Sequence, residues 1–248
     1  MRIVYLGGTK RPHMTTEQIM DELKKMSDPA IKNIFINHGA PEPLFGVRVG
    51  DLKKIQKKVK KNHQLALQLF NTGNSDARYL AGLIADEDQI TKEDLQHWAH
   101  NSGWHMIGEY TVPWVASESR HGYELALEWI EATDDSLQAS GWATLASLVT
   151  IKQDSELDLP HLKQLLHRVE QNLHTAPNRT RYTMNSFVIA LGCSVKELTA
   201  DAVEAGKRMG KVMVDVGNTS CKVPYAPDYI QKAIDKGTVG KKKKGARC

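Results

Sequence analysis

The sequence is poor in cysteine and has no long apolar run, and each absence excludes a class of protein. Its 248 residues contain three cysteines, Cys193, Cys221 and Cys248, with no Cys-x-x-Cys pair and no histidine at a zinc-ligand spacing. We therefore expect neither a disulfide framework nor a zinc site. No stretch reaches the roughly 18 apolar residues that cross a bilayer, and the N-terminus lacks the pattern of a secretory signal. We expect a cytoplasmic protein without membrane spans.

Aromatic residues are also scarce, at 6% of the chain, whereas hydrophobic residues make up 41% and charged residues 25%. This composition is that of an ordinary globular protein with a substantial core, in one large or two small domains. The formal net charge is +4, and the basic residues are concentrated in two segments. These are DLKKIQKKVKKNH, residues 51–63, and the basic tail GKKKKGARC, residues 240–248.

The lysines of the first segment cover most of a helix circumference, so they form either a solvated face or a surface that faces phosphates. The basic tail is flanked by glycine and lies beside the terminus. We expect it to be mobile and to attract nucleic acid without sequence preference. The candidate contacts to a DNA backbone are Lys57, Lys58, Lys61, Lys241, Lys242, Lys243 and Lys244.

Two other patterns resemble ligand sites but fail on their spacing. The histidines, such as His97 and His100, have no acid or cysteine at a ligand-like offset with a recognisable motif. The glycine-containing segment VDVGNTSCK, residues 214–222, lacks the spacing of a phosphate-binding loop. We therefore expect no metal and no cofactor.

Apolar residues recur three and four positions apart along most of the chain, which predicts helices. Helix starts are indicated by Thr15 with Gln18, by Asp28 before a proline and by Thr91. Helices of about 10 to 15 residues, joined by short connections, are expected from about residue 15 to residue 210. No alternating strand pattern interrupts them. The chain is predicted to be all-α, either as a globular bundle or as a stack of helix pairs.

The two ends of the chain do not fit the helical pattern. Residues 1–14 are interpreted as a flexible leader or an added sequence, with Met14 as the natural start. Residues 15–210 form the predicted helical body. Residues 211–248 contain Pro224 and Pro227 and are predicted to form a mostly irregular C-terminal strap across the helical ends, finishing in the basic tail.

Two motifs carry a resemblance to a known family. FGVRVGDLKKI, residues 45–55, and LALQLFNTGNSDARYLAGLIAD, residues 65–86, resemble the bacterial DNA alkylation repair family in order and spacing. The resemblance extends more loosely from about residue 15 to residue 233. The segment GKVMVDVGNTSCKVPYAPDYIQK resembles a branch of the family with a basic C-terminal extension. The resemblance implies an α-solenoid of HEAT-like repeats with a basic concave face for duplex DNA, including alkylated or otherwise damaged DNA.

The founding members of this family are alkylpurine DNA glycosylases, whose Trp-Asp-x-x-Asp pattern falls on NSGWHMIGEY, residues 101–110. Trp104 takes the tryptophan position, His105 the first acid, and Gly108 the catalytic aspartate. Glu109 is adjacent, but one residue turns a helix by about 100°. It would need a local rearrangement of the backbone to replace the aspartate.

The missing carboxylate bears directly on the expected chemistry. A carboxylate about 4 Å from a developing cation contributes roughly 4 kcal/mol at a surface-like dielectric, which corresponds to about a thousandfold in rate. We therefore expect alkylpurine excision to be weak, altered or lost. The family pattern is altered at two further positions. Gly141 stands where the family has a cleft arginine, and Ile189 stands where it has a second tryptophan.

The resemblance places four candidate side chains in the DNA cleft: Trp104, His105, Trp142 and Arg78. Trp142 also fits an apolar helix stripe and would then belong to the core. The other tryptophans are expected in the core. We interpret the chain as a monomeric DNA-binding protein, associated with the nucleoid when bound to DNA. The alternatives are a protein-interaction scaffold and an active glycosylase that uses Glu109.

Overall fold

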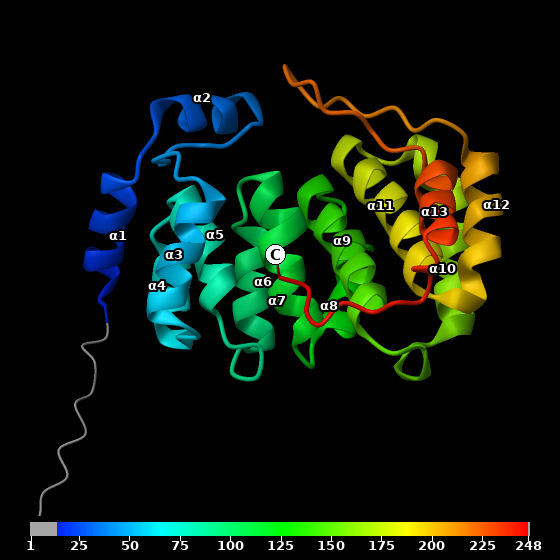
Figure 1. Cartoon of the computed structure of the whole chain (residues 1–248), viewed down its shortest axis with the longest axis horizontal. Helices are drawn as coiled ribbons and strands as arrows, with labels where there is room; N and C mark the ends of the chain where they lie inside the picture. Colours follow the sequence, from blue (N-terminus) through cyan, green and yellow to red (C-terminus); the bar gives the residue numbers. More distant parts are fainter. Residues whose placement is uncertain (1–13, 248) are drawn as a thin grey trace, which may run out of the picture.

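The computed structural model describes residues 14–247, and every regular element within that range is a helix (Figure 1). The prediction of an all-α protein is confirmed. Residues 1–13, which form most of the predicted leader, lie outside the described residues, as does Cys248. The first helices are α1 (Thr16–Lys25), α2 (Pro29–Asn37), α3 (Val49–Val59), α4 (His63–Asn71), α5 (Ser75–Ile84) and α6 (Lys92–His100).

A short π-helical segment, η1 (Ile107–Thr111), opens the second half of the chain and runs directly into α7. Short 3-10 turns lie at Asp154–Glu156, Leu173–Thr175 and Lys196–Leu198. The remaining helices are α7 (Val112–Glu118), α8 (Gly122–Trp129), α9 (Asp135–Ile151), α10 (Leu159–Asn172), α11 (Asn178–Ser194), α12 (Thr199–Met209) and α13 (Ala226–Asp235).

The predicted helix starts are confirmed because their caps are local interactions. Thr15 and Gln18 form a reciprocal capping box at the start of α1. The Asp28 carboxylate accepts hydrogen bonds from the first backbone amides of α2, and Thr91 caps α6. Each of these side chains satisfies backbone donors that have no partner inside the helix.

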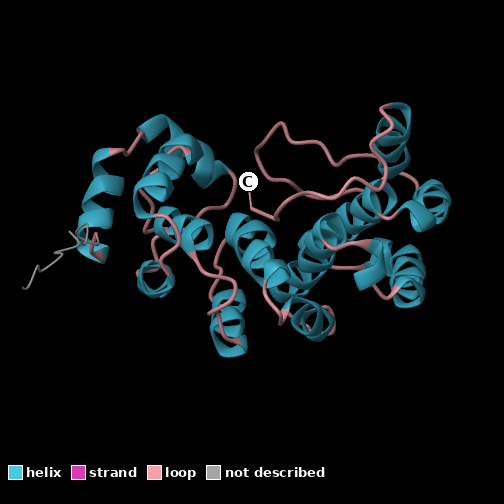
Figure 2. Ribbon diagram, turned by 60° about the horizontal axis from the view of Figure 1, so that its bottom comes forward, coloured by secondary structure: helices cyan, strands magenta, loops and turns pink. Residues whose placement is uncertain are grey.

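The helices form antiparallel pairs stacked into an arc, as expected for a HEAT-like solenoid (Figure 2). The successive pairs are α4 with α5, α6 with α7, α8 with α9, α10 with α11 and α12 with α13. Two apolar clusters fill the space between the layers. The first contains buried residues between positions 19 and 137, and the second contains those between 126 and 230. Each pair therefore buries its apolar side chains mainly against its neighbours.

The end of the chain is mostly irregular, as predicted, but it contains one helix. Residues 211–225 are extended and lie against α11, where Asn178 exchanges two hydrogen bonds of 2.8 Å with the backbone of Asp215. Residues 226–235 then form α13, a helix that the sequence analysis did not predict. The helix forms because its buried face, which includes Ile230, packs against α11 and α12. The basic tail follows α13 and returns across the concave side of the arc (Figure 2).

Candidate nucleic-acid interface

The concave side contains a pocket of about 290 Å³ that is walled by η1, α7, α9, α11 and the basic tail. Its polar and aromatic lining includes Glu109, Tyr110, Trp114, Tyr182, Ser186 and Lys243. Burial raises the pKa of the Tyr110 and Tyr182 hydroxyls, so both remain neutral hydrogen-bonding groups at neutral pH. The pocket therefore combines aromatic faces with neutral hydroxyls, one paired carboxylate and one lysine.

Glu109 lies in this pocket because the backbone is rearranged at its position. The π-helical turn of η1 covers residues 107–111, and π-turns of this kind are common at functional sites. Gly108 does not line the pocket. A side chain at Gly108 would instead begin 3.1 Å from the Ser102 hydroxyl and 3.2 Å from the Ser140 hydroxyl, both of which belong to buried residues. The local rearrangement of the backbone that Glu109 would need is therefore present, while its replacement of the aspartate stays a prediction.

The Glu109 carboxylate is held by Arg179 of α11 in a bidentate ion pair. The guanidinium Nε and Nη2 donate to the two carboxylate oxygens at 2.6 and 2.5 Å. The Glu109 side chain is 4% exposed and that of Arg179 is 23% exposed. Burial raises the pKa of Glu109, while the hydrogen bonds and charge of Arg179 oppose that shift. Arg179 was missed by the sequence reasoning, since only its place near the start of a helix distinguishes it.

Trp104 and His105 face the N-terminal helices rather than an open cleft. The Trp104 indole is 6% exposed, donates from Nε1 to the His38 carbonyl at 2.8 Å, and packs on Phe35 with ring centroids 5.3 Å apart. The predicted place of Trp104 in the DNA cleft is therefore wrong, because the ring is buried and anchors α2. His105 is partly exposed, 6.5 Å from the His38 ring. Burial, with the positive charges of Arg179 and His38, lowers the pKa of His105 to about 4.

The other two candidate cleft residues are also engaged within the fold. Trp142 is fully buried, with Phe187 at a ring-centroid distance of 5.4 Å, so its predicted place in the cleft is wrong. A side chain at the neighbouring Gly141 would begin 2.7 Å from the backbone nitrogen of Ile130, which shows that this position faces α8. Arg78 lies over the Phe70 ring at 5.1 Å and donates to the Phe70 carbonyl. It does not line the concave pocket.

Some of the lysines predicted to bind the DNA backbone form ion pairs with acidic residues of the protein, and others do not. Lys58 forms an ion pair with Glu22 at 3.2 Å, and Lys61 forms ion pairs with Glu87 and Asp86. Lys242 is 7% exposed and pairs with Asp154 at 2.7 Å. The exposed lysines of the two segments that have no ion-pair partner among residues 14–247 include Lys57, Lys60, Lys241, Lys243 and Lys244. Lys60 belongs to the first basic segment and is not among the contacts predicted from the sequence.

The prediction of a mobile basic tail is wrong. The tail is fixed by hydrogen bonds to the carbonyls of Cys193 and Thr150 and by ion pairs from Arg247 to Glu87 and Glu118. Arg247 also shares a surface pocket with Lys57, Lys60 and Lys61. The fold thus brings together two basic segments that are about 180 residues apart in the sequence.

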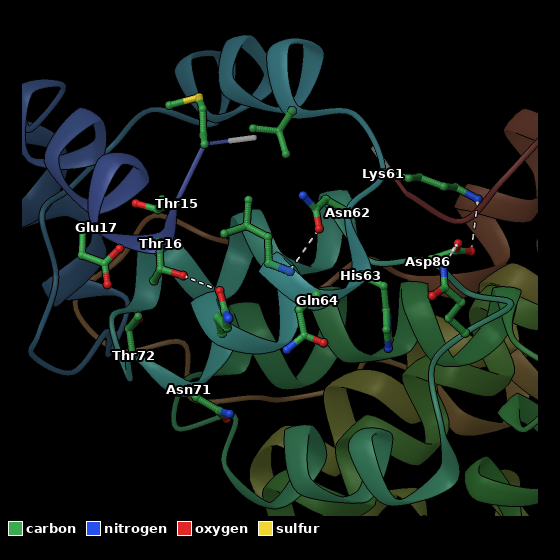
Figure 3. A pocket seen from close by; sticks show the side chains of 15 residues that line it. Thr15, Thr16, Glu17, Lys61, Asn62, His63, Gln64, Asn71, Thr72 and Asp86 are labelled. Carbon is green, nitrogen blue, oxygen red and sulfur yellow. Dashed lines mark hydrogen bonds and ion pairs between the residues drawn. The ribbon is translucent and has the colours of Figure 1, made fainter. Parts of the chain in front are cut away.

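A pocket of about 1050 Å³ lies between α1 and α4, and Lys61 of the first basic segment is part of its lining (Figure 3). Several of its polar side chains contact one another, as shown by the 2.8 Å hydrogen bond from Thr16 to Gln68 and the ion pair between Lys61 and Asp86. Over residues 14–247, no three His, Cys, Asp or Glu side chains gather as a possible metal site. No helix in the same range is long and apolar enough to span a membrane.

Comparisons with known proteins agree with this architecture. The family model for DNA alkylation repair enzymes matches residues 19–230. An uncharacterized protein of Listeria monocytogenes is 37% identical over 226 residues, and one of Listeria innocua is 36% identical. Both alignments cover 89% of this chain and 97% of the relative.

A solved structure that covers 95% of this chain, and is itself covered completely, has a TM-score of 0.87 and 34% identity. It represents a family described as related to the HEAT-like repeat DNA glycosylases, with affinity for branched DNA structures. The chain belongs to the DNA alkylation repair enzyme family.

Proposed function

We propose that the protein binds duplex and branched DNA along its concave side and that it excises alkylpurines inefficiently or not at all. The observation that carries this proposal is the meeting of two basic segments beside the concave pocket, where several lysines have no acidic partner. Lysines without an acidic partner attract phosphates, because their contacts release the counterions that are condensed on the DNA. The affinity of the structurally similar family for branched DNA supports the same function.

The concave pocket argues against efficient excision. An N3- or N7-alkylated purine is already cationic and leaves its sugar readily, so an efficient enzyme mainly stabilises the positive charge that develops on the sugar, for example with a carboxylate. Glu109 provides a carboxylate in the pocket, but Arg179 neutralises it through two hydrogen bonds. An incoming cation would therefore meet a paired carboxylate and the positive charge of Arg179.

DNA binding is tested by fluorescence anisotropy with a linear duplex, a three-way junction and a four-way junction of matched sequence. At about 50 mM salt we expect binding to all three. The double variant Lys57→Gln/Lys60→Gln should bind more weakly than wild type. The control variant Lys163→Gln/Lys207→Gln removes the same charge from exposed, ion-paired lysines of α10 and α12 and should bind like wild type. Absence of binding to every substrate would contradict the proposal and favour a protein-interaction scaffold.

Excision is tested by base release from methylated duplex DNA with wild type and Glu109→Gln. We expect release of 7-methylguanine and 3-methyladenine by wild type to be slow or undetectable. Brisk release that Glu109→Gln abolishes, with the helical circular dichroism of the variant intact, would identify Glu109 as a catalytic residue. That result would overturn this part of the proposal.

A further inference from the structure

The basic tail crosses the C-terminal ends of several helices that form the concave layer. Its Gly240 amide donates to the Cys193 carbonyl of α11 at 3.0 Å, and its Lys243 amide donates to the Thr150 carbonyl of α9 at 2.8 Å. The Lys242 ammonium donates to Val149 of α9 at 2.9 Å. Because one short segment reaches these carbonyls in turn, the helix ends must be aligned along one edge, here called the rim.

The tail continues along the rim to α7 and α5. The Ala246 amide donates to the carboxylate of Glu118, the last residue of α7, at 2.7 Å. The Arg247 guanidinium donates to the carbonyl of Ala85, the C-cap of α5, at 2.7 Å. The same guanidinium pairs with Glu118 at 3.0 Å and with Glu87 at 2.9 Å.

Without the tail, the rim would carry negative charge. The last carbonyls of a helix have no partner within it, and the helix dipole places about half a negative charge at that end. Asp154, Glu87 and Glu118 add three carboxylates along the same edge. Burial acts to raise the pKa of Glu87, but the hydrogen bond and charge of Lys61 and the charge of Arg247 hold it below its ordinary value. This group is therefore ionised at neutral pH. Such an edge repels phosphates.

The basic residues of the tail fall into two groups. Lys242 and Arg247 are 7% and 11% exposed and contact the carbonyls and carboxylates of the rim. Lys241, Lys243 and Lys244 are exposed. Lys243 also borders the concave pocket beside Glu109, and Arg247 lies beside Lys57 and Lys60 of the first basic segment.

We propose that the basic tail converts a negatively polarised rim into a binding surface for the phosphate backbone of DNA. Lys242 and Arg247 neutralise and clamp the helix ends, and Lys241, Lys243 and Lys244 contact phosphates together with Lys57 and Lys60. The phosphate contacts rest on the proposed DNA binding, whereas the clamp does not. The tail is therefore a structural part of the interface rather than a free basic extension.

Two full-length variants separate the two roles. Lys241→Gln/Lys243→Gln/Lys244→Gln removes the exposed charges and keeps the clamp. It should leave the melting temperature unchanged and reduce the slope of log K against log salt by about 2 to 3, since each phosphate contact contributes about 0.9. Lys242→Gln/Arg247→Gln keeps the exposed lysines but leaves Asp154 and Glu118 without their ion-pair partners and Glu87 with Lys61 alone. It should lower the melting temperature, speed hydrogen exchange of the Gly240 and Lys243 amides, and weaken DNA binding.

The control Lys163→Gln/Lys207→Gln removes as much charge as the second variant and should change none of these quantities. If wild type binds DNA and the triple variant keeps its full salt slope, the phosphate contacts are overturned while the proposed function stands. Absence of DNA binding by wild type would instead remove both the function and the contacts. The clamp is overturned if Lys242→Gln/Arg247→Gln keeps the melting temperature and exchange rates of wild type.

Discussion

At the scale of single residues, the Glu109 carboxylate is constrained by its partner. Arg179 occupies both carboxylate oxygens, and its guanidinium also lies over the Tyr182 ring at 4.7 Å. A charged pair of this kind is retained because removal of either partner leaves an uncompensated charge in a poorly solvated place. The pair therefore explains how an ionised carboxylate can persist in this poorly solvated pocket.

The partly buried His105 predicts a pH dependence of stability. Its pKa is about 4 in the folded chain, against 6.5 as its ordinary value, mainly because of burial. Well above pH 6.5 the ring is neutral in both states and has no effect. As the pH falls from 6.5 towards 4, the unfolded chain takes up the proton first, so the folded state loses stability. We expect the urea midpoint to fall over this range, and to fall less for His105→Gln.

This prediction is measured as the difference between the two profiles, because carboxylates also titrate near its lower end. Urea unfolding at pH 7, 6, 5 and 4.5 provides the comparison. Parallel profiles for wild type and His105→Gln would show that the ring does not carry the effect.

At the scale of helices, α8 and α9 approach each other closely at Gly141 of α9. An added Cβ at Gly141 would lie 2.7 Å from the Ile130 nitrogen and 2.9 Å from the Ala126 carbonyl oxygen. Both are backbone atoms and cannot move aside without separating the helices. Gly141→Ala should therefore lower the free energy of unfolding by about 1–3 kcal/mol, the usual range for overpacking.

The matched control for this substitution is Gly50→Ala in α3, where an added Cβ meets no atom within 4 Å. It should raise the free energy of unfolding by about 0.4–1 kcal/mol, because alanine fits this first-turn position and leaves the unfolded chain less conformational entropy than glycine does. Urea denaturation monitored by circular dichroism measures both changes. Equal stability of the two variants would show that α8 and α9 do not approach as closely as described.

At the scale of the whole molecule, the arrangement of charge matters more than its total. The formal net charge is only +4. The two basic segments that meet at the rim nevertheless contain five lysines that have no acidic partner in the described part of the chain. These are Lys57, Lys60, Lys241, Lys243 and Lys244. If all of these lysines contact phosphates, log K for duplex DNA should fall with log salt at a slope of about −4 to −5. Titration between about 50 and 200 mM KCl measures the slope. A slope near −1 would mean that the rim is not the main contact.

Several features of the fold could be predicted because they depend on nearby residues. The caps at Thr15 and Asp28 involve partners within three positions, so they could be recognised from spacing alone. Trp104 and Trp142 were assigned to the cleft because a family pattern gives a position along a helix. It does not say which face of that helix is covered. That depends on the neighbouring helices, which bury both rings.

The amino-acid sequence by itself determined the helical class, the family and the presence of two basic segments, because periodicity, caps and motifs are local properties. Only the tertiary structure decided which charges are free. Glu109 meets Arg179 across 70 positions, and Lys242 meets the carbonyl of Val149 across 93. Such pairings depend on how the helices stack, since an ion pair forms only when the fold brings two groups within about 4 Å. The stacking therefore turned Lys242 and Arg247 inward and left Lys241, Lys243 and Lys244 facing solvent.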